Sequence, residues 1–505
     1  MRVDEQERVA PEAEGLAPLI ILAGLTLLAF GLRFYRLGSW GMESDEVFML
    51  RDSLALSLKN PRPLMYFLNH YVVYPFLPLD EFGIRLLPAI SGVLAIPVFY
   101  AMTRRLVGTR AALIGAFFVA TSGLFVTYSQ FGRYWTLVFL LSSVYPYALY
   151  LGIRDGNGRM LALGTVTAVL AALAHPVSVL LLGGLGVWII VTYAKRDRLT
   201  ELWSHKGVRW TAFIAAILAL IIAMRFVPML QSWIRAHDQV PMSERGGEFL
   251  LHTPGGQGVR QIALLMVYVQ NLTPPLILAG LLGIFMLWRQ ERTRSLGLLM
   301  ACVLVLPAAF ILLVQIRTAV SIFYLIPTMP ALFIGTGVFL DRLFGLETGL
   351  RPRWLLSAAV GFMIFTDGAP TLISQYRDGK RYDFRGAARW LDERMAPGDV
   401  LFSDQPQVVA HYLPERDVRR LVADPVRLAR AEDTLQQTSG KATLWIVTPA
   451  PSHAFRTNPK LGSMNDWIYT NCQLRSTIGV GRLDFRQNYL QIYRCPPTAP
   501  APGPA

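Results

Sequence analysis

The feature that most constrains this chain is a series of apolar segments, each close to the length that crosses a bilayer. About 20 apolar residues are needed to span about 30 Å of hydrocarbon as a helix. Eleven segments fit, at 16–35, 85–103, 111–128, 135–153, 160–176, 177–194, 210–230, 261–288, 296–315, 319–340 and 354–374. A composition of 53% hydrophobic and 16% charged residues excludes an ordinary water-soluble protein. The sequence therefore predicts an all-α polytopic membrane domain with about 11 transmembrane helices.

The last part of the chain has a different character. Residues 376–505 carry 18 Lys and Arg and 13 Asp and Glu, whereas charges are sparse before them. An amphipathic helix is expected at 383–395, with short apolar strands at 400–404, 444–448 and 489–495, a pattern typical of a small α/β domain. We therefore divide the chain into a membrane domain, 1–375, and a soluble domain, 376–505, which ends in a Pro-rich tail.

The orientation follows from basic residues in the short loops. Sixteen Lys and Arg fall in alternate loops, which the positive-inside rule assigns to the cytoplasm. The acid-rich start, with Arg33 and Arg36 after the first segment, opposes this assignment, but the summed loops outweigh it. The start also lacks the cleavage pattern of a signal peptide, so the first segment is expected to stay as a membrane helix. These signals predict a multi-pass plasma (inner) membrane protein with an extracytoplasmic C-terminal domain.

Cysteine and charge usage narrow the class further. Cys472 and Cys495 are the two cysteines of the soluble part, and in an oxidising compartment such a pair predicts one disulfide. The net charge of +14 does not indicate nucleic acid as a partner, because the basic residues punctuate apolar runs instead of forming a patch.

The segment 36–84 is an external loop too long to be a simple connector. It is rich in aromatic and apolar residues, including His70, and we expect short helices lying on the outer leaflet. Near its start, in GMESDE, stand Asp45 and Glu46. One interpretation is simple solvation of acidic residues; the other is a site at the outer membrane face.

Cations occur at the same face. The turn YSQFGRYW carries Arg133 and Tyr134, and Arg85, His175 and Arg317 lie at other segment ends. A lone arginine at a boundary is often a snorkelling anchor. Together with the acids, however, the set suits transfer from a lipid-linked phosphosugar: carboxylates deprotonate a hydroxyl, and arginines stabilise a departing phosphate.

At these residues the chain resembles the GT-C glycosyltransferases of the protein O-mannosyltransferase and aminoarabinose-transferase group (glycosyltransferase family 39-like). The resemblance rests on the Asp45-Glu46 pair, the stretch from Arg85 to Trp135 and the His175 element, and it covers roughly residues 30–195 well. It implies a GT-C fold and inverting transfer of a hexose or pentose from a polyprenyl-phosphate donor to an acceptor hydroxyl, outside the cytoplasm. The acceptor, whether protein, lipid or glycan, stays open.

The resemblance also implies roles for single residues. Asp45 matches the expected general base, and Glu46 would orient the acceptor or support Asp45. Arg133 would contact donor phosphate or the acids. Apart from the resemblance, Tyr134, Arg85, His70 and His175 are further candidate substrate contacts. In SIFYLIPTMP, Phe323 stands where the family has an arginine, and Arg317 is the candidate substitute. A divalent metal stays unknown, since no ligand cluster of recognisable spacing occurs.

Two rival classes remain at this stage. A transporter or lipid flippase for a glycan precursor also places charges within membrane helices, although no internal repeat is evident. A non-catalytic scaffold for polysaccharide assembly is the other.

Overall fold

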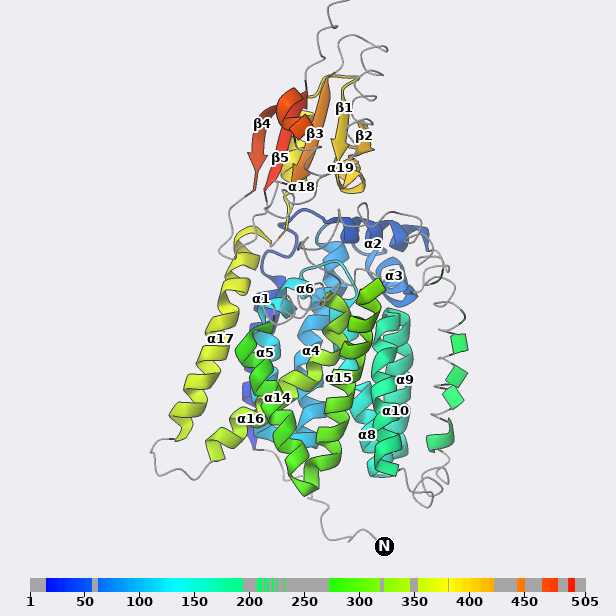
Figure 1. The fold of residues 1–505 in the computed structure, drawn as a ribbon, viewed down its shortest axis with the longest axis vertical. Helices are drawn as coiled ribbons and strands as arrows, with labels where there is room; N and C mark the ends of the chain where they lie inside the picture. The colour runs from blue at the N-terminus through cyan, green and yellow to red at the C-terminus, as the bar shows by residue number, and fades with distance from the viewer. Residues whose placement is uncertain are drawn as a thin grey trace, which may run out of the picture.

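The computed structural model describes residues 15–56, 62–193, 207–210, 272–317, 322–345, 353–379, 381–421, 443–449, 466–479 and 489–495, with isolated positions between 213 and 231. In this part, long helices form an upright bundle, and a small sheet stands at one end of it (Figure 1). The helices α2 and α3, from the segment 36–84, lie between bundle and sheet (Figure 1).

Most of the longer helices run along the bundle (Figure 1), whereas the short α6 is turned away from α5. Their bounds are α1 Leu16–Phe34, α4 Gly83–Val107, α5 Thr109–Thr121, α6 Gly123–Ser129, α7 Trp135–Ser142, α8 Tyr145–Arg154, α9 Gly158–Ala174, α10 Leu180–Tyr193, α14 Pro274–Arg289, α15 Arg294–Arg317, α16 Met329–Gly345 and α17 Arg353–Asp378. The short 3-10 helices η3 Pro176–Val179, η4 Glu291–Thr293 and η5 Ile322–Thr328 precede α10, α15 and α16.

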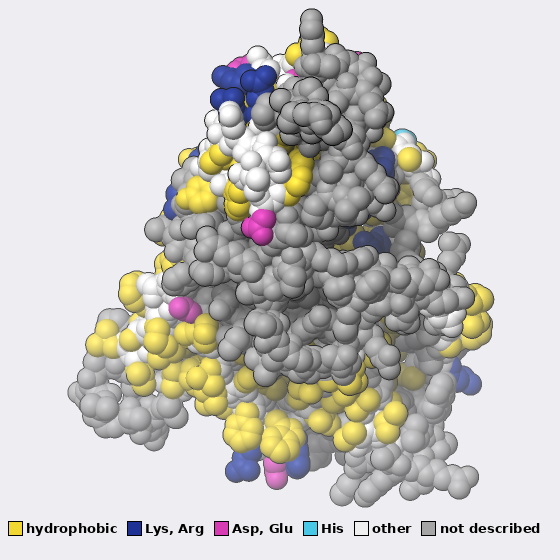
Figure 2. Space-filling model, turned by 45° about the horizontal axis from the view of Figure 1, so that its top comes forward, with side chains coloured by type: hydrophobic (Ala, Val, Ile, Leu, Met, Phe, Trp, Pro, Cys, Tyr) yellow, Lys and Arg dark blue, Asp and Glu magenta, His cyan; other side chains and the backbone are white. Residues whose placement is uncertain are grey.

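The predicted membrane fold class is confirmed. Within the described residues, 7 helices are long and apolar enough to cross a membrane, or up to 8 if the bent pair α5–α6 is one span. The helices α9 and α14 are apolar but shorter. Most of the segment expected at 210–230 lies outside the described residues. On the face in Figure 2, apolar side chains gather over the lower, helical part, with charged groups beneath and above it.

One predicted span is broken. The segment expected at 111–128 bends by 58° between α5 and α6, at Ser122. A bend frees carbonyls at the end of α5, and a buried residue of α1 binds two of them: Arg33 donates to Ala120 at 2.9 Å and to Val119 at 3.0 Å. The expected segments at 160–176 and 177–194 are separate, as predicted, with His175 between α9 and η3.

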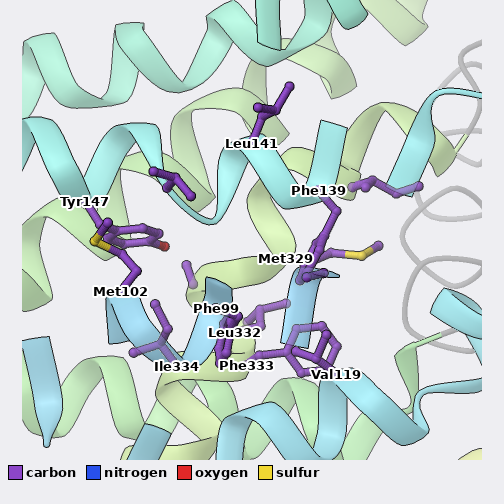
Figure 3. Close-up of a cluster of buried hydrophobic side chains, with 14 of the residues drawn as sticks. Phe99, Met102, Val119, Phe139, Leu141, Tyr147, Met329, Leu332, Phe333 and Ile334 are labelled. Carbon is purple, nitrogen blue, oxygen red and sulfur yellow. The ribbon is translucent and has the colours of Figure 1, made fainter. Parts of the chain in front are cut away.

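The core of the bundle is aromatic and tightly packed. Figure 3 shows Phe99, Phe139 and Phe333, from α4, α7 and α16, among its buried side chains. Helices α14 and α16 are in close backbone contact at two glycines. A Cβ on Gly283 would lie 1.8 Å from the carbonyl oxygen of Gly335, so only glycine fits there.

The C-terminal part forms a mixed sheet of order β2-β1-β3-β5-β4. Its strands are β1 Val400–Ser403, β2 Asp417–Arg420, β3 Leu444–Pro449, β4 Gln473–Ile478 and β5 Leu490–Cys495. Strand β1 pairs in parallel with β2 and β3, whereas β5 is antiparallel to β3 and β4. The three strands expected from sequence are β1, β3 and β5. The edge strands β2 and β4 escaped prediction because they are mostly exposed and lack an apolar pattern.

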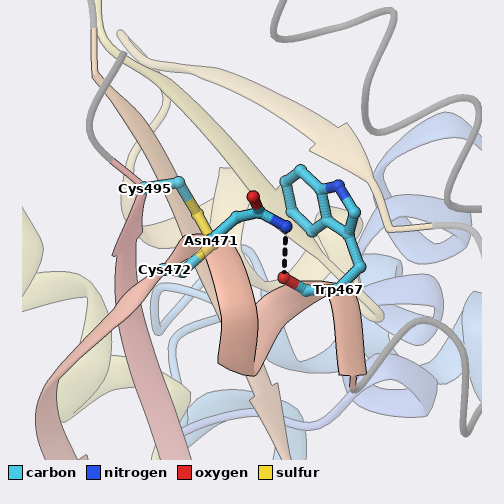
Figure 4. Close-up of a disulfide and its surroundings, with 4 residues drawn as sticks. All are labelled: Trp467, Asn471, Cys472 and Cys495. Atoms are coloured by element: carbon cyan, nitrogen blue, oxygen red, sulfur yellow. Dashed lines mark hydrogen bonds between the residues drawn. A yellow bond between two sulfur atoms is a disulfide. The ribbon is translucent and has the colours of Figure 1, made fainter. Parts of the chain in front are cut away.

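Helices α18 Phe384–Asp392 and α19 Pro406–Tyr412 pack on one face of the sheet. A disulfide joins Cys472 to Cys495, beside the helical turn that holds Trp467 and Asn471 (Figure 4). Helix α17 continues to Asp378, so the domain border expected after residue 375 lies in its last turn.

Candidate active site

The site is built on the external loop, which forms α2 Ser44–Ala55, α3 Pro63–Leu68 and the π-helical turn η2 Asn69–Val73. A capping box begins α2: Glu43 caps the helix, and the Glu46 side chain accepts from the backbone N–H of Glu43 at 3.0 Å. The first turn of α2 therefore carries Asp45 and Glu46, held at the top of the bundle.

The Glu46 carboxylate is fully buried and saturated with hydrogen bonds. Besides Glu43, its donors are Arg85 (Nε at 2.7 Å, Nη2 at 2.9 Å), Arg381 (Nη1 at 2.7 Å) and the backbone N–H of Gly132 at 2.7 Å. Burial by itself would raise the pKa of the Glu46 carboxyl, but the guanidinium groups of Arg85 and Arg381 outweigh it and lower the pKa to about 2. We call Glu46, Arg85 and Arg381 the Glu46 hub.

The two arginines of the hub use their other donors on backbone carbonyls. Arg85 binds the carbonyls of residues 37, 40 and 41, so its five N–H groups are all engaged. This differs from the expected role of Arg85 as a substrate contact, because no donor is left for a phosphate. Arg381 binds the carbonyls of residues 379, 41 and 130.

Asp45 has different surroundings. Its side chain is 40% exposed and accepts a hydrogen bond from Arg133 Nη2 at 3.0 Å, while the side chain of Arg133 is 9% exposed. The backbone of Gly132 is bound to Glu46, so the hub holds the neighbours of both Asp45 and Arg133. The accessible carboxylate of Asp45 is thus paired with the buried guanidinium of Arg133.

Aromatic rings surround Arg133. Its guanidinium lies 5.2 Å from the ring centre of Tyr134, which stacks in turn with His175 at 4.9 Å. Arg62 donates to the Tyr134 hydroxyl at 2.7 Å. Burial raises the pKa of Tyr134 to about 12, although Arg133 and Arg62 oppose the rise, so the hydroxyl keeps its hydrogen.

Several buried N–H groups around Arg133 lack a hydrogen-bond partner within the described residues. They are Arg133 Nε, Trp135 Nε1 and His175 Nε2. Nδ1 of His175 accepts from the backbone N–H of Val177, so the hydrogen of the neutral ring is on Nε2. Buried donors left unpaired are costly in a folded protein, and an acceptor that bound beside them would satisfy them. We call Arg62, Arg133, Tyr134, Trp135 and His175 the Arg133 cluster.

The remaining predicted residues lie elsewhere. His70, in η2, contacts the Ser53 carbonyl at 2.9 Å and the rings of Tyr71 and Tyr74, none of which belongs to the cluster. Arg317 ends α15, but its side chain lies outside the described residues. Phe323, at the family's arginine position, packs 5.5 Å from the Trp135 ring.

Arg62 and Arg381 escaped sequence reasoning. Arg62 lies at the start of α3, with no acidic or motif residue nearby to single it out. Arg381 is 335 residues from Glu46, and no local pattern reports such a contact. Within the described part of the chain, no three His, Cys, Asp or Glu side chains gather as metal ligands. Asp45 and Glu46 are both engaged with arginines.

With this geometry in view, the chain can be compared with known proteins. The family model for dolichyl-phosphate-mannose-protein mannosyltransferase matches residues 61–227, less than half of the chain. No curated protein sequence matches this chain.

Solved structures extend the likeness to nearly the whole chain. The structure of ArnT from Cupriavidus metallidurans bound to undecaprenyl phosphate is 15% identical, covers 95% of this chain and 98% of its own, and has a TM-score of 0.55. The archaeal oligosaccharyltransferase AglB from Archaeoglobus fulgidus, in complex with an inhibitory peptide and a dolichol-phosphate, is 15% identical, covers 86% of this chain and 69% of its own, and has a TM-score of 0.55. The predicted GT-C fold is confirmed.

Proposed function

We propose that this protein is a membrane glycosyltransferase that moves a sugar from a polyprenyl-phosphate donor to an acceptor hydroxyl. One observation carries the proposal: a partly exposed carboxylate, Asp45, is paired with Arg133 beside buried N–H groups that lack partners among the residues the structure describes. The Asp45 carboxylate provides a base for a hydroxyl, and the buried N–H groups provide hydrogen-bond donors for a phosphate. The lipid phosphates in the ArnT and AglB structures support a polyprenyl-phosphate donor.

In the proposed reaction, Asp45 removes the proton of the acceptor hydroxyl as the oxygen attacks the anomeric carbon. The bond between that carbon and the phosphate oxygen breaks, and its electron pair leaves with the polyprenyl phosphate. Attack from the face opposite the leaving group inverts the anomeric carbon. A positioned base contributes about 10²- to 10⁴-fold to such a step.

The phosphate gains negative charge as it leaves, and the Arg133 cluster is suited to receive it. Arg133 and Arg62 supply fixed positive charge, and Trp135 Nε1 and His175 Nε2 supply neutral donors. Binding of phosphate to Arg133 would weaken its pairing with Asp45, which frees the carboxylate to act as a base. We propose that Glu46 and Arg85 hold these groups in place and do not touch substrate.

We also propose that the reaction takes place outside the cytoplasm, at the plasma membrane. The sixteen basic residues of the alternate loops support this orientation. The loop helices α2 and α3 and the C-terminal sheet are at the same end of the bundle (Figure 1). The domains would be a catalytic membrane part, 1–375, and an extracytoplasmic part, 376–505. The sugar is a hexose or pentose, and the acceptor is a protein, lipid or glycan.

The test uses purified protein in detergent or liposomes with radiolabelled polyprenyl-phosphate mannose and polyprenyl-phosphate arabinose. We expect wild-type protein to release sugar from one of these donors, and Asp45→Asn to release far less. A transporter would move the intact donor between leaflets without cleaving it, and a scaffold would do neither. Equal sugar release by wild type and Asp45→Asn would contradict the proposal.

A further inference from the structure

The C-terminal domain contacts the residues that flank Asp45 on both sides. The Tyr412 hydroxyl accepts from the backbone N–H of Met42 at 2.7 Å. Gln407 donates to the hydroxyl of Ser44 at 2.6 Å, and Arg381 donates to Glu46 at 2.7 Å. Residues of the C-terminal part, which follows α17, thus hold the first turn of α2 and the residues just before it in place.

Arg381 has a special place among these contacts because it reaches both halves of the site. Its Nη1 binds Glu46, next to Asp45, and its Nη2 binds the carbonyl of Gln130 at 3.1 Å, in the turn that presents Arg133. The side chain is almost fully buried, at 4% exposed. One guanidinium therefore ties the start of α2 to the 130–133 turn.

Arg85 cannot replace it. The Arg85 guanidinium binds Glu46 and carbonyls of residues 37, 40 and 41, all in the segment before or within α2. Of the two arginines in the hub, Arg381 alone has a bond to the turn before Arg133. Glu46 also accepts directly from the backbone N–H of Gly132, so Arg381 adds a second link, supplied by the C-terminal part, between the start of α2 and this turn.

We propose that Arg381 is a positioning residue that sets the alignment of Asp45 with Arg133, and that the C-terminal domain completes the active site by delivering it. This inference rests on the proposed function of the Asp45–Arg133 pair. Misplacement of a reacting group by about 1 Å can cost on the order of 10²-fold in rate. Loss of Arg381 should lower turnover more than donor binding, because the Arg133 cluster itself stays intact.

The experiment compares Arg381→Ala, Arg381→Lys and the control Arg385→Ala. Arg385 belongs to the same domain and contacts the loop through Glu81, but it does not touch Glu46. We expect Arg381→Ala to lower kcat roughly 10- to 100-fold with a donor KM near wild type. Arg381→Lys should recover part of kcat, and added guanidinium ion at non-denaturing concentration should partly rescue Arg381→Ala. Arg385→Ala should keep wild-type kcat.

A second measurement does not depend on activity. Hydrogen exchange by mass spectrometry on the full chain should show faster exchange in peptides covering 41–48 and 129–135 in Arg381→Ala, but not in Arg385→Ala. If wild type transfers no sugar yet exchange responds this way, the positioning stands and the proposed function falls. Wild-type kcat in Arg381→Ala, or equal kcat losses in Arg381→Ala and Arg385→Ala, would overturn the inference. So would a lowered melting temperature with unchanged kcat and unchanged exchange.

Discussion

Asp45 and Glu46 are adjacent in sequence, yet they lie in contrasting regions. In the Glu46 hub, five hydrogen bonds satisfy a fully buried carboxylate, and the arginines have partners on every side. In the Arg133 cluster, buried N–H groups lack partners within the described residues, and the carboxylate that pairs with Arg133, that of Asp45, is 40% exposed.

The contrast separates two uses of buried polar groups. A network whose members are all satisfied resists rearrangement, since any movement leaves a charge unpaired at low dielectric. A cluster with unpaired donors gains a partner when an acceptor group binds. We therefore expect substitution of Glu46, at the centre of the hub, to affect stability first, and substitutions at Asp45 and in the cluster to affect chemistry first.

The largest expected effect is on turnover. Asp45→Asn should lower kcat by about 10²- to 10⁴-fold, because the acceptor hydroxyl loses its base. Its melting temperature should stay near wild type, since the Asn oxygen can still accept from Arg133. The measurement pairs steady-state kinetics with a thermal melt in detergent. A large drop in melting temperature would mean that Asp45 contributes to stability, as expected of Glu46, and not mainly to catalysis.

Glu46→Gln tests the other side of the comparison. Removing one partner from a buried ion network typically costs about 3–5 kcal/mol, because the opposite charges stay buried without compensation. Here Arg85 and Arg381 would both lose their carboxylate. Chemical or thermal denaturation should show this loss, with Asp45→Asn as the matched control one residue away. Unchanged stability would mean that the hub tolerates a neutral centre.

A smaller effect is expected at the phosphate end. A hydrogen bond to a charged group contributes about 1.5–3 kcal/mol, so Arg133→Ala should weaken binding of undecaprenyl phosphate by roughly 10- to 100-fold. Arg62→Ala should weaken it less, since Arg62 is already engaged with Tyr134. Arg105→Ala is the control, because Arg105 is exposed at the far end of α4. Wild-type affinity in Arg133→Ala would exclude this residue from the donor site.

The smallest effect is a pH dependence. The pKa of Glu46 is lowered from 4.5 to about 2, so its stabilisation is complete above pH 4.5 and is lost as pH falls towards 2. Wild type and Glu46→Gln should therefore differ most in melting temperature near neutral pH, and the difference should narrow below pH 4.5. A difference that stays constant to the lowest pH at which the protein remains soluble would contradict the lowered pKa.

Sequence reasoning predicted the parts of the fold that local pattern determines. Apolar runs identify membrane helices because hydropathy acts within each segment. The bend at Ser122 was not predicted, because the donor for the freed carbonyls is Arg33, at a sequence separation of 87 from Ala120. Strands β2 and β4 were not predicted either, since exposed edge strands carry no buried face.

The same limit applies to the candidate site. The motif resemblance drew attention to Asp45 and Arg133, and these two side chains do meet. It did not distinguish Asp45 from Glu46 by environment, because burial of Glu46 depends on Arg381, far along the chain. The resemblance directed attention to the region of Phe323, where the family has an arginine. In the structure, Arg62, from the segment 36–84, contacts Tyr134 instead. Charges supplied by other segments leave no signal in a local pattern.

The contact of Arg33 with the end of α5 bears on how the protein is assembled in the membrane. Arg33 is the penultimate residue of α1, where a long basic side chain can reach the aqueous interface while α1 stands alone. In the folded bundle the guanidinium donates to the carbonyls of Val119 and Ala120, beside the bend between α5 and α6. An unsatisfied backbone group in hydrocarbon costs several kcal/mol. A charge that opposes insertion of the first helix by itself therefore supplies donors to backbone carbonyls at the break between two other helices.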